Sequence, residues 1–404
     1  MPYFKKTFLV FFLFAYLPIA PIFAKFIPLS LMGFSFWNTE FPFLSVLFYV
    51  FANGLIKKKT ELVFIFTFLI LIIIIILMRS IILYEDLFHD LFSSWFLFFP
   101  LFSIIALRYI NFKDKVNIIN IILFLQILFH GLSGWFYILG LPTIEFASIE
   151  KLVGGRFEGI YGASNGYSNY LFSFFLLLAM LNHGKNALIL LCSIVVFGGI
   201  AVSGSRLPLL LLFLTLLFVV VKSFKINKLS AIVLFTFIYL VIIFSVNYLP
   251  FDIQESRLFT QGIVDTGRIT KNNIAIEGLS SSFSSFIFGL SGSQFFKNGI
   301  GISDNSFTLI PISYGMIVFV FWLLLILFFS RFKLVYFRNS TLAFYLFCNL
   351  LIFSTNNSIL WLPWVYFTIF GYYILKNVLS EHFVPKELEL AKKCMNRPKG
   401  LFMM

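Results

Sequence analysis

The sequence predicts an all-α polytopic membrane protein with about 12 transmembrane helices. Three observations predict this class: 60% of the 404 residues are hydrophobic, only 12% are charged, and long apolar runs recur along the chain. Soluble domains typically carry about 25% charged residues. Because a soluble fold does not bury so much apolar surface, the solvent around the chain must be lipid. We expect a single integral membrane domain over residues 1–404.

Apolar runs of roughly 17–25 residues are long enough to cross a bilayer as helices. The first run follows Lys5 and Lys6 and imitates a signal peptide. Because hydrophobic runs continue behind it, we interpret it as an uncleaved first span. The 59 phenylalanines are interpreted as lipid-facing bulk. The expected spans are 7–24, 41–56, 61–78, 91–107, 116–139, 166–182, 187–203, 206–221, 229–249, 305–329, 340–354 and 359–375.

The distribution of charge predicts the topology. With the N-terminus inside the cell, the cytoplasmic segments hold 21 of the 30 basic residues and only five of the 17 acidic ones. This asymmetry is the positive-inside rule, and it explains the net charge of +13 without a nucleic-acid partner. Both termini are therefore expected in the cytoplasm, with a basic tail at 376–404.

The largest outer segment is a loop at 250–304, between spans 9 and 10. Long loops in compact domains are usually functional or disordered. The stretch "GRITKNNIAIEGLSSSFSSF" in this loop predicts an amphipathic helix at the outer membrane interface. Its residues at helical spacing are Ile269, Asn273, Ile276, Leu279 and Phe283.

Three of the nine outer basic residues stand out, because Arg156, Arg206 and Arg268 each follow a Gly or Ser stretch. Because glycine has no Cβ, the backbone of such a stretch can approach a ligand closely. The other six, Arg79 among them, lie at span ends or in loops that we interpret as solvated.

Arg206 has the most specific context, "SGSRLP", between spans 7 and 8. Ser203 or Ser205 can cap the following helix, and Pro208 suits its first turn. A helix N-terminus carries partial positive charge, so an arginine added there predicts an anion site near the membrane surface. The alternative is an arginine that snorkels to lipid headgroups.

An enzyme facing away from the cytoplasm needs a donor that was activated beforehand, and a lipid-linked pyrophosphate qualifies. Arginines bind phosphate oxygens bidentately and can stabilise the leaving pyrophosphate without a metal or cofactor. An acceptor hydroxyl needs a base, for which Asp304 in "GISDNSF" and Glu158 are the candidates. The alternative roles are a helix cap or solvated carboxylate for Asp304, and a surface acid or arginine partner for Glu158.

Three stretches resemble one known superfamily. These are "GRFEGIYGASNGYSNYL", "VSGSRLPLLLL" and the region from Arg268 through "FIFGLSGSQF" to "SDNSFTLIPISYG". The resemblance is to O-antigen polymerases of the Wzy type and O-antigen ligases, and it covers about residues 155–330. It implies a GT-C-like glycosyltransferase at the outer face of the bacterial inner membrane.

The resemblance implies undecaprenyl-pyrophosphate-linked oligosaccharides as substrates, held by Arg156, Arg206 and Arg268. It implies supporting roles for Asn165, Ser205 and Asn305, and a protein partner that regulates chain length. Ligases of this superfamily carry a histidine before the asparagine of the large loop, where this chain has Asp304. That difference favours a polymerase, with a ligase or a flippase for the same lipid-linked unit as alternatives.

Overall fold

The structure is a computed structural model. The residues it describes are 2–29, 36–83, 94–142, 157, 159, 164–182, 184–224, 273–274, 276–290, 306–331, 339–355 and 362–379. Across these segments the backbone forms helices joined by short turns and contains no strand. The predicted all-α class is therefore confirmed for this part of the chain.

Helices occupy every predicted span except 229–249, which lies outside the described residues. The helices at the first spans are α1 (Pro2–Tyr16), η1 (Leu17–Ile19), α2 (Ala20–Phe26), η2 (Phe36–Glu40), α3 (Phe41–Ala52), α4 (Lys59–Leu83), α6 (Trp95–Leu107), η3 (Lys113–Lys115) and α7 (Val116–Ile138). They are followed by α8 (Ser164–Leu181), α9 (Asn186–Ser203), α10 (Arg206–Phe224), α15 (Phe283–Phe288), α17 (Ser306–Ser330), α18 (Ser340–Thr355) and α19 (Leu362–Leu379).

Five helices in the described part of the chain are long and apolar enough to cross a membrane. They are Lys59–Arg79, Lys113–Ile138, Asn186–Ser203, Arg206–Ser223 and Leu309–Ser330. Shorter apolar helices lie at several of the other predicted spans, such as Phe41–Ala52 and Leu97–Leu107. The chain is thus a helical membrane protein, and the number 12 stays a prediction.

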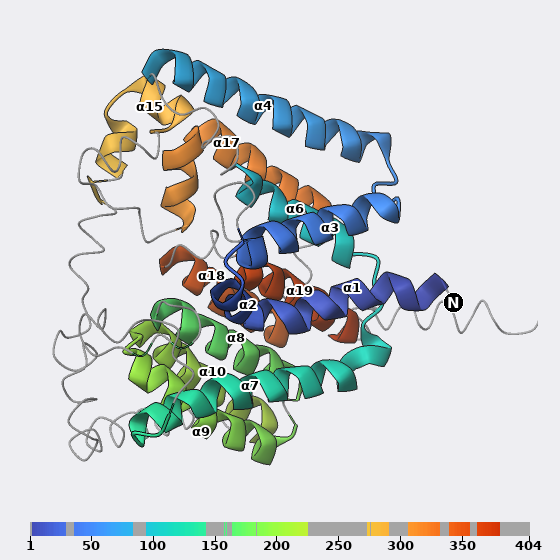
Figure 1. Cartoon of the computed structure of the whole chain (residues 1–404), viewed down its shortest axis with the longest axis vertical. Coiled ribbons are helices and arrows are strands. Elements are labelled where there is room, and N and C mark those ends of the chain that lie inside the picture. The colour runs from blue at the N-terminus through green and yellow to red at the C-terminus, as the bar shows by residue number, and fades with distance from the viewer. Residues whose placement is uncertain are drawn as a thin grey trace, which may run out of the picture.

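One set of helix ends gathers on a single side of the protein. Arg108, after α6, forms an ion pair with Glu61 of α4 at 2.7 Å, and both side chains are buried. Further contacts on this side join Arg108 to the Leu55 carbonyl, Asn120 of α7 to Asn182 after α8, Lys222 of α10 to Thr341 of α18, and Asn377 of α19 to the Ile110 carbonyl. We call this side the Arg108 face, and it lies at the right of Figure 1.

The other helix ends gather on the opposite side, which we call the Arg206 face. Contacts there join Arg79 of α4 to the Ser313 carbonyl, Ser205 to Asn165, Phe157 to Val202, and Trp37 to the Ile27 carbonyl. Consecutive helices therefore alternate in direction from α4 to α10 and again from α17 to α19, while the predicted span between α10 and α17 lies outside the described residues. The assignment of the Arg108 face to the cytoplasm remains a prediction.

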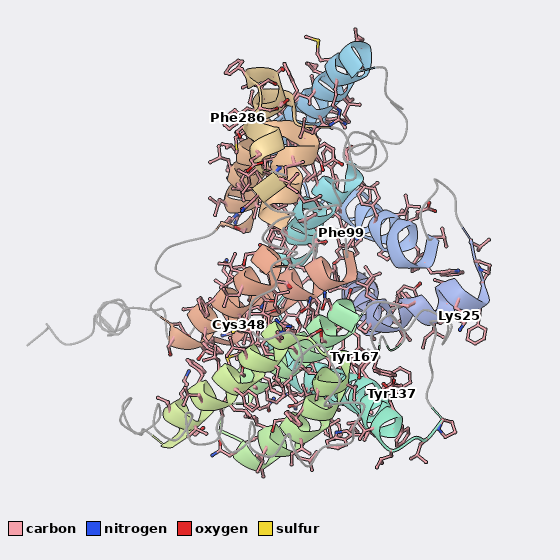
Figure 2. The ribbon with its side chains drawn as sticks, turned by 90° about the vertical axis from the view of Figure 1, so that its left-hand side faces the viewer. Lys25, Phe99, Tyr137, Tyr167, Phe286 and Cys348 are labelled. Carbon is pink, nitrogen blue, oxygen red and sulfur yellow. The ribbon has the colours of Figure 1, made fainter. Side chains whose placement is uncertain are left out.

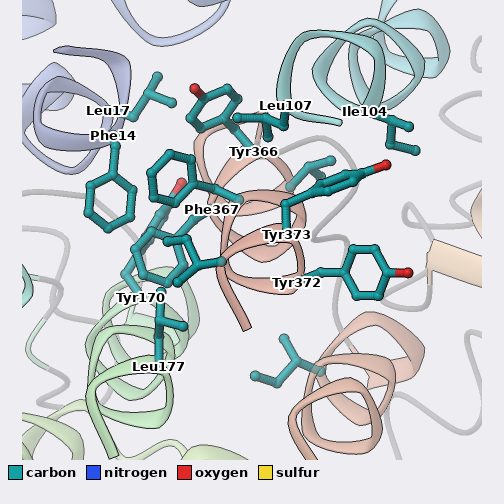
Figure 3. Close-up of a cluster of buried hydrophobic side chains, with 14 of the residues drawn as sticks. Phe14, Leu17, Ile104, Leu107, Tyr170, Leu177, Tyr366, Phe367, Tyr372 and Tyr373 are labelled. Carbon is teal, nitrogen blue, oxygen red and sulfur yellow. The ribbon is translucent and has the colours of Figure 1, made fainter. Parts of the chain in front are cut away.

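Figure 1 shows the helices stacked along the long axis of the molecule, with α4 and α17 at one end and α7 and α9 at the other. The helix α19 lies between these groups, and Figure 3 shows its aromatic surroundings. The Phe14 ring stacks on Phe370 at 4.2 Å, and Phe174 meets Phe367 edge-on at 4.9 Å. The expectation that phenylalanines are lipid-facing is therefore only partly right, because many of them form the core between helices.

Glycines allow α7 and α9 to lie in backbone contact. A Cβ added to Gly134 of α7 would overlap the Cα of Gly199 of α9, and one added to Gly198 would overlap the Trp135 ring. The Trp135 indole in turn donates a hydrogen bond to the Ile194 carbonyl at 3.1 Å. Small residues at such crossings give membrane helices their close packing, which is their main source of association.

The substitution Gly134→Ala is expected to destabilise the protein, because the new methyl group forces α7 and α9 apart. Overpacking of this kind typically costs about 1–3 kcal/mol. Thermal unfolding in detergent measures the effect. Gly184→Ala is the matched control, because nothing lies within 4 Å of a Cβ added there. Equal unfolding midpoints for the two variants would contradict the packing account.

Candidate functional site

The turn between α9 and α10 places Arg206 at the first position of α10. Gly204 ends α9 with φ +64°, a left-handed conformation that glycine adopts without a steric penalty, and its N–H donates to the Ala201 carbonyl at 3.1 Å. Pro208 is buried in the first turn of α10, where its missing N–H removes no helical hydrogen bond. The expected arginine at a helical hairpin is thus confirmed.

Two of the predicted site residues meet at this turn. The Ser205 hydroxyl donates to Oδ1 of Asn165, the second residue of α8, at 3.0 Å. Ser205 is buried, and its N–H donates to the Ser203 hydroxyl at 3.3 Å. The expectation that one of these serines caps α10 is corrected in part, because the Ser205 side chain fastens the hairpin to α8.

The Arg206 side chain is covered by protein atoms at one of its nitrogens. The residue as a whole is half-buried, and Nη1 is fully buried. A side chain that reaches out to lipid headgroups would leave its guanidinium uncovered. One guanidinium nitrogen of Arg206 is therefore covered by protein at the start of α10, and the anion site there stays a prediction.

A segment before α8 lies against the end of α9. The Phe157 N–H donates to the Val202 carbonyl at 3.1 Å, and the Phe157 ring meets the Tyr167 ring edge-on at 5.1 Å. Gly159 has φ +56°, and a Cβ there would lie 2.5 Å from the Tyr167 ring. Tyr167 itself is buried and donates to the His130 carbonyl at 2.6 Å (Figure 2). Phe157 and Gly159 are therefore packed against the end of α9 and the Tyr167 ring beside the Arg206 hairpin.

The remaining predicted site residues lie outside the described part of the chain. These are Arg156, Glu158, Arg268, Asp304 and Asn305. Arg156 and Glu158 are the two chain neighbours of Phe157, and Asn305 directly precedes α17. Among the described segments, no three His, Cys, Asp or Glu side chains come together as a metal site.

A break in α17 was not predicted from the sequence. Gly315 has φ +86° and ψ +160° inside this helix, and Pro311 lies one turn before it. The backbone of α15 fits into the break, because a Cβ on Gly289 would lie 2.6 Å from the Gly315 nitrogen. Arg79 donates to the Ser313 carbonyl, and the Leu290 N–H donates to the Ile312 carbonyl. These donors bind carbonyls that the break removes from the helical pattern.

Arg79 lies at the end of a span, as expected, but its contact was missed by the sequence analysis. The residue is only 2% exposed and its side chain lies against α17. Its position at the end of a long apolar run gave no sign of this contact. The signal that could have found it is the pair of helix-breaking residues in "IPISYG", whose freed carbonyls need a donor.

The amphipathic helix predicted in the large loop is interrupted. Residues 276–280 are helical, the chain bends at 281–282, and Ser282 caps α15 by accepting the Ser285 N–H at 3.0 Å. Leu279 packs on Ile312 of α17, whereas Phe283 is 82% exposed. The expected single apolar face is therefore wrong, because serine caps a new helix at the bend. Figure 2 shows Phe286 of α15 far from Tyr167 along the long axis.

No match was found when the chain was compared with known protein families, curated proteins and solved structures.

The substitution Gly315→Ala is expected to release the segment 276–290 from α17, because the new methyl group would overlap the Ile287 carbonyl. The measurement is thiol labelling of a Leu279→Cys variant, since Leu279 is 8% exposed when docked. Labelling should become at least several times faster. Gly54→Ala is the control, because Gly54 has φ +55° but open space around it. An unchanged labelling rate would show that the glycine contact does not hold the segment.

The Ser205–Asn165 hydrogen bond is expected to fasten the hairpin to α8. Ser205→Ala and Asn165→Ala should each lower the free energy of unfolding by about 1 kcal/mol. The double variant should lose less than the sum, because both substitutions remove the same bond. Unfolding in detergent measures all three variants, and strictly additive losses would argue against a direct interaction.

Proposed function

We propose that this chain is a surface-polysaccharide polymerase of the O-antigen type. It transfers the growing glycan from undecaprenyl pyrophosphate to the terminal sugar of a lipid-linked repeat unit. The reaction takes place at the outer face of the bacterial inner membrane. The proposal includes the 12-span GT-C-like architecture, with the Arg108 face in the cytoplasm and the Arg206 face outside.

One observation carries the proposal: two of the stretches that resemble the superfamily are in direct contact. The Phe157 N–H donates to the Val202 carbonyl, and the Ser205 hydroxyl donates to Asn165, so Phe157, the start of α8 and the "SGSRLP" hairpin form one unit. They lie next to the start of α10, where Arg206 has a buried guanidinium nitrogen. Such a site suits a phosphate group at the membrane surface.

In the proposed reaction the acceptor hydroxyl forms a bond to the anomeric carbon of the donor sugar. The bond between that carbon and the pyrophosphate oxygen breaks, and the electron pair leaves on the pyrophosphate. Arg206, together with Arg156 and Arg268, stabilises this developing charge. The hydroxyl proton passes to a carboxylate, for which Asp304 and Glu158 are the candidates.

The charge distribution supports the proposed orientation. Exposed lysines cluster at the Arg108 face, at Lys57–Lys59 and at Lys113. Lys57 also lies 4.7 Å from the centre of the Tyr109 ring, which Arg108 contacts as well. Basic clusters of this kind stay on the cytoplasmic side of bacterial membranes.

The first test is deletion of the gene in its host, followed by electrophoresis of the surface glycan. Loss of the ladder with a single repeat unit on the lipid core is expected for a polymerase. Polymer that accumulates on the lipid carrier would instead indicate a ligase. Repeat units trapped at the cytoplasmic face would indicate a flippase and would overturn the proposal.

Arg206→Ala is expected to reduce chain extension about a hundredfold or more, the usual effect of removing a group that stabilises charge in the transition state. Arg206→Lys should remain partly defective, because lysine cannot bind phosphate bidentately. Chain length on a gel and the amount of protein in the membrane are measured together. Arg331→Ala is the control, since Arg331 is exposed after α17. Normal ladders from both Arg206 variants would remove the pyrophosphate site from the proposal.

A further inference from the structure

A line of polar side chains runs along one face of α8 from the Arg206 hairpin. Asn165, Asn169 and Ser173 follow one another at intervals of four residues, and residues four apart are neighbours on a helix surface. Asn165 accepts a hydrogen bond from Ser205, and the Ser173 hydroxyl donates to the Asn169 backbone carbonyl at 2.7 Å. Asn169 thus lies between Asn165 and Ser173 along this face of α8.

The Asn169 side chain differs from the other buried asparagines of the described residues. Asn182 exchanges hydrogen bonds with Asn120, and Oδ1 of Asn349 accepts from Thr368 at 3.0 Å. Asn169 is only 5% exposed, yet no donor in the described part of the chain reaches its buried Oδ1. A buried amide oxygen without a donor is destabilising, and natural proteins contain few of them.

The position of this oxygen relates it to the anion site. Asn169 lies one turn along α8 from Asn165, a rise of about 6 Å. Asn165 accepts a hydrogen bond from Ser205, the residue directly before Arg206. A ligand that places a phosphate at the start of α10 therefore brings its adjoining groups within reach of the α8 face.

The chemistry of an amide oxygen limits what it can bind. It accepts hydrogen bonds and donates none, so phosphate oxygens and lipid chains do not suit it. The hydroxyl groups of a sugar do. We propose that Oδ1 of Asn169 accepts a hydrogen bond from a hydroxyl of the glycan, which makes Asn169 a substrate-binding residue. The inference rests on the proposed function, and it assigns the glycan part of the substrate to the α8 face.

The experiment compares two probes on the full-length protein purified in detergent. One is undecaprenyl pyrophosphate, and the other is the lipid-linked repeat unit extracted from the host. Asn169→Leu removes the acceptor and keeps most of the volume. It should weaken binding of the repeat unit by roughly three- to tenfold, the usual effect of one hydrogen bond, and leave binding of undecaprenyl pyrophosphate unchanged. Arg206→Ala should weaken binding of both probes.

Thermal unfolding provides a readout that separates binding from structure. Asn169→Leu should keep or raise the unfolding temperature, because it removes an unsatisfied polar group. Asn349→Leu is the matched control and should lower that temperature, because it breaks the bonds to Thr368 and Tyr345. If leucine does not fit at 169, Asn169→Ala serves for the same comparison.

Several outcomes would overturn the inference while the proposed function stands. These are unchanged binding of both probes by Asn169→Leu, equal weakening of both, or a loss of stability as large as that of Asn349→Leu. Failure of the unaltered protein to bind either probe would overturn the proposed function itself, and the inference with it.

Discussion

The fold depends on the need to hydrogen-bond every backbone group inside a bilayer, where water is absent. Helices meet this need within themselves, which is why the described chain is helical throughout its apolar runs. The break in α17 is the informative exception. There a buried arginine, Arg79, and the Leu290 N–H bind the carbonyls of Ser313 and Ile312. The segment 276–290 thereby packs onto the helical domain, since its Leu290 N–H binds a carbonyl that α17 itself leaves unpaired.

The same constraint explains the construction of the Arg206 hairpin. Glycines let α7 and α9 approach closely, and Tyr167 fits beside Gly199 and Gly159 to reach the His130 carbonyl. This packing fixes the start of α8 relative to the end of α9. The hydrogen bond from Ser205 to Asn165 then joins the α9–α10 turn to the start of α8. A site for a charged ligand needs such rigidity, because its groups must be held in place before the ligand arrives.

The sequence predicted the helices well because apolar runs and basic ends follow directly from the bilayer. The meeting of Ser205 and Asn165 could be expected only through the family resemblance, since 40 residues separate them. The contact of Arg79 with Ser313 was missed because 234 positions separate the two residues, and the positive φ of Gly315 was missed because it depends on the packing of Ile287 against α17. The bend at Ser282 was missed for a local reason. The Ser282 hydroxyl accepts the Ser285 N–H and so starts a new helix, although the spacing of apolar residues indicates one continuous helix.

The buried ion pair between Glu61 and Arg108 has a consequence for biogenesis. The two residues are 47 positions apart, and each side chain is at most 4% exposed once paired. During synthesis Glu61 leaves the ribosome first, and a lone carboxylate is costly in hydrocarbon. Glu61 therefore has no paired arginine until α6 has followed, and the contact that buries both charges forms only then. The final packing of α4 thus depends on a helix that is synthesised later.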